Sequence, residues 1–304
     1  MSELVLHNKV GGYFKIEATK PDGSQRVVAD WFPNLITDYG LEAWASQSNM
    51  LAYCRVGSGT ASPTVTDTNL GTQVAAIGSY GWTTGSQPTA PYYVWVTYTY
   101  IFPIGTAAGN LSEIGVGHSA TGSTLWSRAR IKDGSGNDTT ITILSDEQLT
   151  VNYQLRMYVP TTDATGSLTI GGVSRSFVLR AANCTGAWTN TSGSSQWFNT
   201  PFGQPRADMA FCYSGGLGAI TAQPTGTSAG NTGAAPTTGS YSSGSRYIDV
   251  TTSWGTDYGN VAGGVSAMLL QTMQGNYQVS FSPVLEKDNT KTMSITIRQS
   301  WGRY

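Results

Sequence analysis

The chain of 304 residues carries 17 Lys and Arg against 18 Asp and Glu, so its net charge is -1, and charged residues make up only 12 %. This balance gives no bulk electrostatic attraction to nucleic acid or to an anionic membrane. The sequence has no continuous stretch of about 18 apolar residues, so we expect no transmembrane helix. Because so little charge weakens repulsion between copies, we expect the protein to associate with other copies of itself.

The composition predicts an all-β protein. The chain has 37 Gly and 16 Tyr, and this mixture favours short strands and many turns over helices. The first residues, MSELVLHNKVGGYF, lack the apolar core of a signal peptide, so we expect synthesis in a cytosol. The length exceeds that of a typical domain and favours two.

The three cysteines, Cys54, Cys184 and Cys212, are too few and too far apart for a disulfide framework or a zinc site. His7 and His118 stand apart from them. We interpret the cysteines as small packing residues, and we expect neither a metal nor another cofactor.

The first elements in chain order are a hairpin and a helix. Residues 13–19 alternate apolar and polar side chains, residues 21–25 read PDGSQ and predict a turn, and residues 26–32 return as a second strand. We expect this hairpin, 13–32, to dock to neighbours by strand addition. Asp38 is a candidate cap for one short helix near 38–47.

The strongest strand signal is YYVWVTYTYIF at 92–102. Val94, Val96, Tyr98, Tyr100 and Phe102 share one predicted face, and Tyr93, Trp95, Thr97 and Thr99 share the other. A strand of this kind needs cover on both faces, from a second sheet or another subunit. We therefore identify a possible interface strand carrying Tyr93, Trp95, Tyr98 and Tyr100.

Further strands are expected at 111–118, 125–133, 140–144 and 148–159, with a turn at 134–138. Short strands separated by regular turn signals are typical of a β-sandwich or barrel.

The second half of the chain then repeats the first in the same order. MAFCYSGGLG at 209–218 resembles LAYCRVGSG at 51–59, so that Cys54 aligns with Cys212. Lys132-Asp133 aligns with Lys287-Asp288, and TVNYQLRM at 150–157 aligns with TMSITIRQ at 292–299. We predict a tandem duplication that gives two β-sandwich-like domains, an N-terminal one at 1–160 and a diverged copy at 161–304.

No motif predicts catalysis. GSG at 57–59 lacks the Lys and helix of a phosphate loop, and DGSGND at 133–138 lacks the closing Glu of a calcium loop, so both are interpreted as turns. The adjacent Asp146 and Glu147 point to opposite faces of a strand and cannot pair, so we place them at a solvated turn. His118 has neither a nucleophile motif nor an acid partner beside it.

Aromatic residues in loop-like sequence form the main candidate binding site. They could stack on sugar rings, anchor long loops or fill a subunit interface. These residues are Trp82, Trp188, Trp197, Tyr241 and Trp254.

Four stretches carry a resemblance to a known family: WFPNLITDYGLEAW at 31–44, VGSGTASPTVTDTNLG at 56–71, LSEIGVG at 111–117, and the run from LWSRARIKDG to YQLRMY at 125–158. Together they resemble tailed-bacteriophage virion proteins, namely tail-fibre, tail-appendage and collar components. The resemblance covers roughly residues 26–160. It implies assembly, and it carries no catalytic residues over to this chain. The second half matches only through the internal repeat, with Ser282-Pro283-Val284 where Ser127-Arg128-Ala129 stands.

These observations predict a non-enzymatic structural protein of a phage tail or neck, made in the host cytoplasm and located in the virion. Its expected partners are other copies of itself and other tail or neck proteins. The alternative is a lectin-like tail tip that recognises a host surface glycan through the loop aromatics. A secreted carbohydrate-active enzyme would need paired carboxylates in a groove, and few acidic residues lie near those aromatics.

Overall fold

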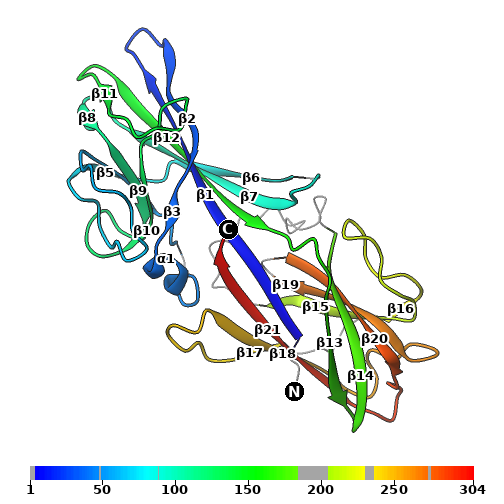
Figure 1. The fold of residues 1–304 in the computed structure, drawn as a ribbon. Coiled ribbons are helices and arrows are strands. Elements are labelled where there is room, and N and C mark those ends of the chain that lie inside the picture. Colours follow the sequence, from blue (N-terminus) through cyan, green and yellow to red (C-terminus); the bar gives the residue numbers. More distant parts are fainter. Residues whose placement is uncertain (1–3, 48, 88, 184–204, 230–235, 273–274) are drawn as a thin grey trace. The chain divides into compact units, whose positions relative to one another are not determined.

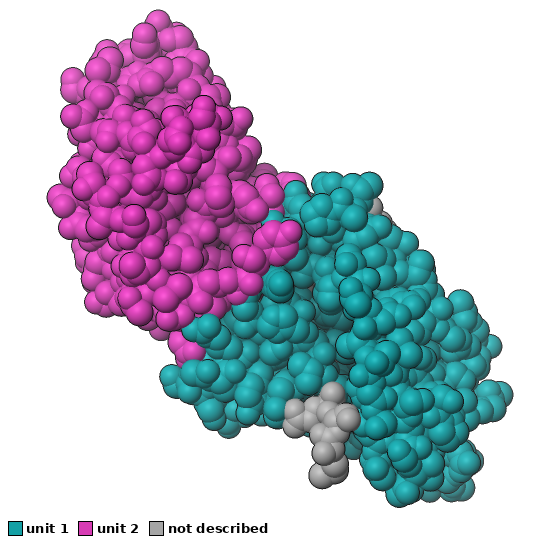
Figure 2. All heavy atoms as spheres, viewed as in Figure 1, with its two compact units in different colours: residues 1–9, 85–94, 157–302 teal, residues 10–84, 95–156, 303–304 magenta. Residues whose placement is uncertain are grey.

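The computed structural model describes residues 4–47, 49–87, 89–183, 205–229, 236–272 and 275–304. The chain divides into two compact units, coloured separately in Figure 2. Unit 1 comprises residues 1–9, 85–94 and 157–302, and unit 2 comprises residues 10–84, 95–156 and 303–304. Both units therefore contain segments from distant parts of the chain.

The described residues form strands and one short helix, which confirms the all-β prediction (Figure 1). The elements in chain order are β1 (Leu4–Thr19), β2 (Gln25–Pro33), β3 (Leu35–Ile36), α1 (Asp38–Ala43), β4 (Tyr53–Gly57), β5 (Gln73–Gly78), β6 (Gly81–Gln87), β7 (Tyr93–Phe102), β8 (Gly109–Leu111), β9 (Glu113–Gly117), β10 (Leu125–Arg130), β11 (Ile141–Ile143), β12 (Gln148–Tyr158), β13 (Ala164–Ile170), β14 (Val173–Ala182), β15 (Pro205–Tyr213), β16 (Ser228–Ala229), β17 (Thr237–Thr238), β18 (Tyr247–Trp254), β19 (Val265–Thr272), β20 (Gly275–Leu285) and β21 (Met293–Arg303).

The long strand β1 contributes to the core along its whole length. Every second residue from Leu4 to Ala18 is buried, as a strand with one face on a core requires. Near its end β1 pairs with β2 from Tyr13↔Pro33 to Thr19↔Gln25, which confirms the predicted hairpin.

The pairing of β1 limits where the hairpin could dock to neighbours by strand addition, and the docking itself stays a prediction. β1 already pairs with β12, β21 and β2, whereas β2 pairs with β1 alone among the described residues. An added strand could therefore form main-chain hydrogen bonds at the outer edge of β2. Removing residues 1–20 would destroy a core strand and could not isolate a docking role.

Unit 2 has two facing sheets. One is the five-stranded sheet β3-β10-β9-β4-β5, and the other runs from β1 through β12 and β7 to β6. Large side chains join them: the indole Nε1 of Trp126 on β10 donates to the hydroxyl of Tyr153 on β12 at 3.0 Å, and the ring of Tyr153 packs on Phe14 at 4.8 Å between centroids. The core of unit 2 lies between the sheets.

Unit 1 is built in the same manner. Its six-stranded sheet has the order β13-β14-β20-β19-β15-β16, and a second row runs from β1 through β21 and β18 to β17. The hydroxyl of Tyr277 on β20 bonds Oδ1 of Asn8 on β1 at 2.6 Å, and both side chains are buried.

The strand orders of the two units correspond. Without β13, the order β14-β20-β19-β15-β16 has the same chain sequence as β3-β10-β9-β4-β5, and all neighbouring strands are antiparallel in both. The rows β12-β7-β6 and β21-β18-β17 correspond as well. Cys54 on β4 and Cys212 on β15 occupy equivalent strands. The correspondence supports the duplication predicted from the sequence, which stays a proposal.

The helix is shorter than expected and has a different cap. α1 covers Asp38–Ala43, and its N-cap is Thr37, whose hydroxyl accepts the N–H of Gly40 at 2.9 Å. Asp38 lies in the first helical turn, where its carboxylate favours the positive end of the helix and pairs with Arg303 at 2.6 Å. A Cβ added at Gly40 would overlap the carbonyl oxygen of Trp126, so only glycine allows this close approach.

The remaining strand predictions agree with the structure to within a few residues. β7 has the predicted alternation, with Val94, Val96, Tyr98, Tyr100 and Phe102 buried and the other face half-buried. The turn after β10 is stabilised by Asp133, whose carboxylate accepts the N–H groups of Ser135 and Asn137 at 2.9 Å each, which confirms that DGSGND is a turn.

Cys54 and Cys212 are buried free thiols, as expected for packing residues. Burial raises the pKa of Cys54 well above its ordinary value and that of Cys212 to about 12. Because the thiolate is the reactive form, both should be inert in the folded protein.

We predict that Cys184→Ser protein, which retains only these two thiols, reacts with a disulfide reagent at pH 8 far more slowly when native than when denatured. Absorbance at the reagent's thiolate band measures the rate. Equal rates in the native and denatured states would contradict the burial of both cysteines.

Candidate functional site

A buried carboxylate on the five-stranded sheet of unit 2 is the candidate site. Glu113 on β9 is fully buried, and its oxygens accept the main-chain N–H groups of Gly59 at 3.0 Å, Gly71 at 3.0 Å and Thr72 at 2.8 Å. These donors come from the segment between β4 and β5. Glu113 therefore holds both ends of that segment against the five-stranded sheet.

Arg128, on the neighbouring strand β10, neutralises this carboxylate. Its Nε and Nη2 donate to Oε2 of Glu113 at 3.0 and 2.7 Å. Its Nη1 donates to Asp67 at 2.7 Å, and Nη2 also reaches the carbonyl oxygen of Ala61 at 3.0 Å. We call Glu113, Arg128 and Asp67 the ionic network.

The pKa directions agree with this pairing. Burial by itself would raise the pKa of Glu113, but the N–H groups of Thr72 and Gly71 together with Arg128 lower it below the ordinary value of 4.5. Burial would likewise lower the pKa of Arg128, yet the bonds to Asp67 and Glu113 raise it. Both groups are therefore charged at neutral pH.

The other stretches that carry the family resemblance meet at the same strand. Asn34 donates to the hydroxyl of Ser127 at 2.7 Å, and the hydroxyl of Thr37 donates to the carbonyl oxygen of Leu125 at 2.6 Å. Asp67 also accepts the N–H of Thr64 at 2.9 Å. The four stretches are far apart in sequence, and each contributes residues that bond to β10 or to a side chain bonded to it.

A second buried arginine orders an adjacent loop. All three guanidinium nitrogens of Arg55 donate, and the acceptors include the carbonyl oxygens of Ser119, Thr121 and Gly122. Nη2 also reaches the hydroxyl of Thr124 at 2.5 Å. Arg55 therefore stabilises the turn between β9 and β10.

The aromatic candidates are not brought together by the structure. Trp254 ends β18 and is only 1 % exposed, so it is a core residue and not a loop residue. Tyr241 stacks on the buried Trp301 at 5.8 Å between ring centroids. Trp82 lies on β6 and is 42 % exposed. Trp188 and Trp197 lie outside the described residues.

The possible interface strand divides into two pairs. Tyr98 and Tyr100 are buried within the chain, and the hydroxyl of Tyr100 donates to the carbonyl oxygen of Leu51 at 2.5 Å. They are core residues, so contact with another copy stays a prediction for Tyr93 and Trp95, on the half-buried face of β7.

Glu147 differs from the expectation of a solvated turn. It is buried, accepts Nη2 of Arg26 at 2.8 Å and the N–H of Leu144 at 2.9 Å, and these bonds lower its pKa. The ring of His118 forms a hydrogen bond between Nδ1 and the carbonyl oxygen of Asn49 at 3.3 Å. Within the described ranges, no three His, Cys, Asp or Glu residues gather as a metal site would require, and no helix is long and apolar enough to cross a membrane.

Comparisons with known proteins add no relative: no protein-family model, curated protein or solved structure matches this chain. The interpretation of the site therefore depends on its own geometry.

We predict that Glu113→Gln lowers the free energy of unfolding by about 3–5 kcal/mol at pH 7, because it removes the fully buried one of the two counter-charges of Arg128. Urea denaturation measures the change. Glu286→Gln is the control, since Glu286 is 79 % exposed and its loss should cost less than about 0.5 kcal/mol.

The same variant should change the dependence of stability on pH. The pKa of Glu113 is lower in the folded protein than its ordinary value, so its contribution is complete above about pH 4.5 and disappears as the pH falls through the folded pKa. Acid titration of stability should be less steep for Glu113→Gln than for the wild type. Identical slopes would contradict the assignment.

We predict that Gly59→Ala is destabilising by about 1–3 kcal/mol, because its Cβ would overlap the ion-paired Glu113 carboxylate. Gly81→Ala is the matched control, since nothing lies within 4 Å of a Cβ at that position. Thermal unfolding compares the two, and equal melting temperatures would show that the carboxylate does not pack against Gly59.

Proposed function

We propose that this protein is a non-enzymatic structural component of a bacteriophage virion, assembled on the tail or neck. The observation that carries the proposal is the position of the residues that make up the family resemblance. Four of these residues are buried, and each forms a hydrogen bond with another of the resembling stretches: Glu113, Arg128, Ser127 and Thr37. Their hydrogen bonds and ion pairs stabilise the domain, as we expect of a protein whose function is assembly.

Exposed apolar side chains at sheet edges support association with other proteins. Val27 and Trp31 on β2 are 55 % and 40 % exposed, and β2 is an outer strand. Tyr80 immediately precedes β6, the last strand of its row, and Trp82 is the second residue of that strand; both are exposed. Exposed strand edges with large apolar residues favour pairing with other chains unless they are covered.

The lectin-like alternative has less support from the side chains. Of its five aromatic candidates, Trp254 is buried, Tyr241 stacks within the chain, and only Trp82 is an exposed ring among the described ones. A glycan site based on stacking would need several exposed rings close together.

The proposal predicts that the purified full-length protein forms a closed homo-oligomer, because edge strands gain main-chain hydrogen bonds and cover apolar area on association. Mass photometry measures the assembly directly. A trimer favours a fibre, and a larger ring favours a collar or adaptor. A stable monomer at all concentrations would contradict assembly through copies of this chain.

Variants locate the interface. Trp31→Glu or Trp82→Glu should shift the mass distribution toward monomer, since a charge in a covered apolar contact is costly. Leu144→Glu is the control, because Leu144 is 50 % exposed and lies outside β2 and β6. If all three variants assemble like the wild type, neither edge is the interface.

A further inference from the structure

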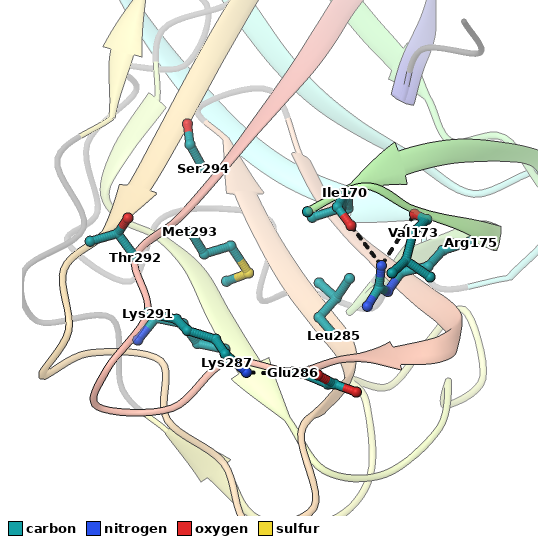
Figure 3. Close-up of a pocket in the computed structure, with 11 residues that line it drawn as sticks. Ile170, Val173, Arg175, Leu285, Glu286, Lys287, Lys291, Thr292, Met293 and Ser294 are labelled. Carbon is teal, nitrogen blue, oxygen red and sulfur yellow. Dashed lines mark hydrogen bonds and ion pairs between the residues drawn. The ribbon is translucent and has the colours of Figure 1, made fainter.

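A pocket of about 400 Å³ opens in unit 1 between the β13–β14 turn and the segment that joins β20 to β21 (Figure 3). Its apolar lining consists of Ile170, Val173, Leu285 and Met293. The turn beneath it is tight, because Gly171 and Gly172 both have positive φ values. The volume suits a small molecule of the size of one sugar unit or a short organic acid.

Arg175 on β14 forms part of the pocket wall and is only 6 % exposed. Its Nε donates to the carbonyl oxygen of Val284 at 3.3 Å, and its Nη1 donates to those of Ile170 at 2.7 Å and Val173 at 3.2 Å. Figure 3 shows the bonds from Nη1, with the rest of the guanidinium beside the pocket. No described residue accepts a hydrogen bond from Nη2, and no described carboxylate forms an ion pair with Arg175.

The other cations of the pocket are already satisfied. Nζ of Lys287 donates to three oxygens: the carbonyls of Thr256 and Asp288 and Oδ1 of Asn260. Lys291 lies 3.7 Å from Glu286 and 3.4 Å from Asp288. Arg175 differs from both lysines, because its Nη2 has no hydrogen-bond acceptor among the described residues.

The other two buried arginines among the described residues differ from Arg175 in their partners. Arg128 is paired with two carboxylates, and every nitrogen of Arg55 donates to a loop oxygen. An arginine that lines a pocket and has an N–H group without a protein acceptor favours an anionic ligand, because a charged hydrogen bond to a carboxylate is strong.

We propose that this pocket binds a small carboxylate-bearing molecule, whose carboxylate accepts the Nη2 hydrogens of Arg175. The carboxylate of Glu286 is also among the lining groups and repels a second negative charge, so a monoanion is favoured over a dianion such as sulfate. The apolar lining contacts the body of the ligand, and the hydroxyls of Thr292 and Ser294 lie among the lining groups.

Titration of the full-length protein with sodium glucuronate and with sodium isovalerate, followed by NMR, tests the proposal. Glucose and sulfate serve as controls, because the first lacks the carboxylate and the second carries two charges. We expect both carboxylates to bind about tenfold or more tightly than either control. Tighter binding of glucuronate identifies an acidic sugar as the source, and tighter binding of isovalerate identifies an aliphatic acid.

Val173→Glu locates the site without removing Arg175. Residues 173 and 175 share one face of β14, so the new carboxylate can occupy the position of the ligand. It should weaken binding about tenfold or more. Val74→Glu is the matched control, since Val74 and Val173 are both valines on strands and each is 44 % exposed. Arg175→Met should abolish binding, and circular dichroism checks that it folds.

Binding of glucose or sulfate as tight as that of the carboxylates would overturn the proposal. So would the absence of carboxylate binding at millimolar concentration, or a Val173→Glu protein that binds like the wild type. If Arg175→Met does not fold, the Val173→Glu and Val74→Glu pair still decides.

Discussion

The ion pair between Glu113 and Arg128 holds the segment between β4 and β5 against the five-stranded sheet of unit 2. Two buried charges on neighbouring strands are stable only when each is paired and hydrogen-bonded. Glu113 meets this condition by recruiting the main-chain N–H groups of Gly59, Gly71 and Thr72, and Arg128 meets it by reaching Asp67. The segment between β4 and β5 is consequently fixed to the sheet at several points, although it has little apolar surface of its own.

The alternation of apolar and polar residues predicted most strands, because β1, β7 and β12 each bury every second side chain. The partners of buried polar groups were not predictable in this way. Glu113 bonds residues more than forty positions away, and Glu147 pairs with Arg26, so their burial depends on tertiary contacts. Trp254 was assigned to a loop because its sequence neighbours are polar, but it ends a strand whose alternate residues face the core. One indication of the ionic network was present in the sequence: each of two strand-like stretches contains a charged residue.

Because the strand orders of the two units correspond, the two proposed copies can be compared position by position. In the sequence alignment Pro283 occupies the position of Arg128, so the second half lacks the arginine that completes the ionic network. A different arginine, Arg175, bonds the carbonyl oxygen of the next residue, Val284, and lines a pocket. The two halves thus use a buried guanidinium differently: one holds a protein carboxylate and the other faces a cavity. This difference agrees with a first half devoted to construction and a second half open to an additional role.

Glu113 and the segments bonded to it build the domain of unit 2. Hydrogen exchange of the amides of Gly59, Gly71 and Thr72 tests this claim most directly, because each donates to the buried carboxylate of Glu113. We expect strong protection of all three amides in the wild type and joint loss of that protection in Glu113→Gln, while the amides of unit 1 stay protected. Exchange of these three amides at the rate of an unstructured chain in the wild type would contradict the claim.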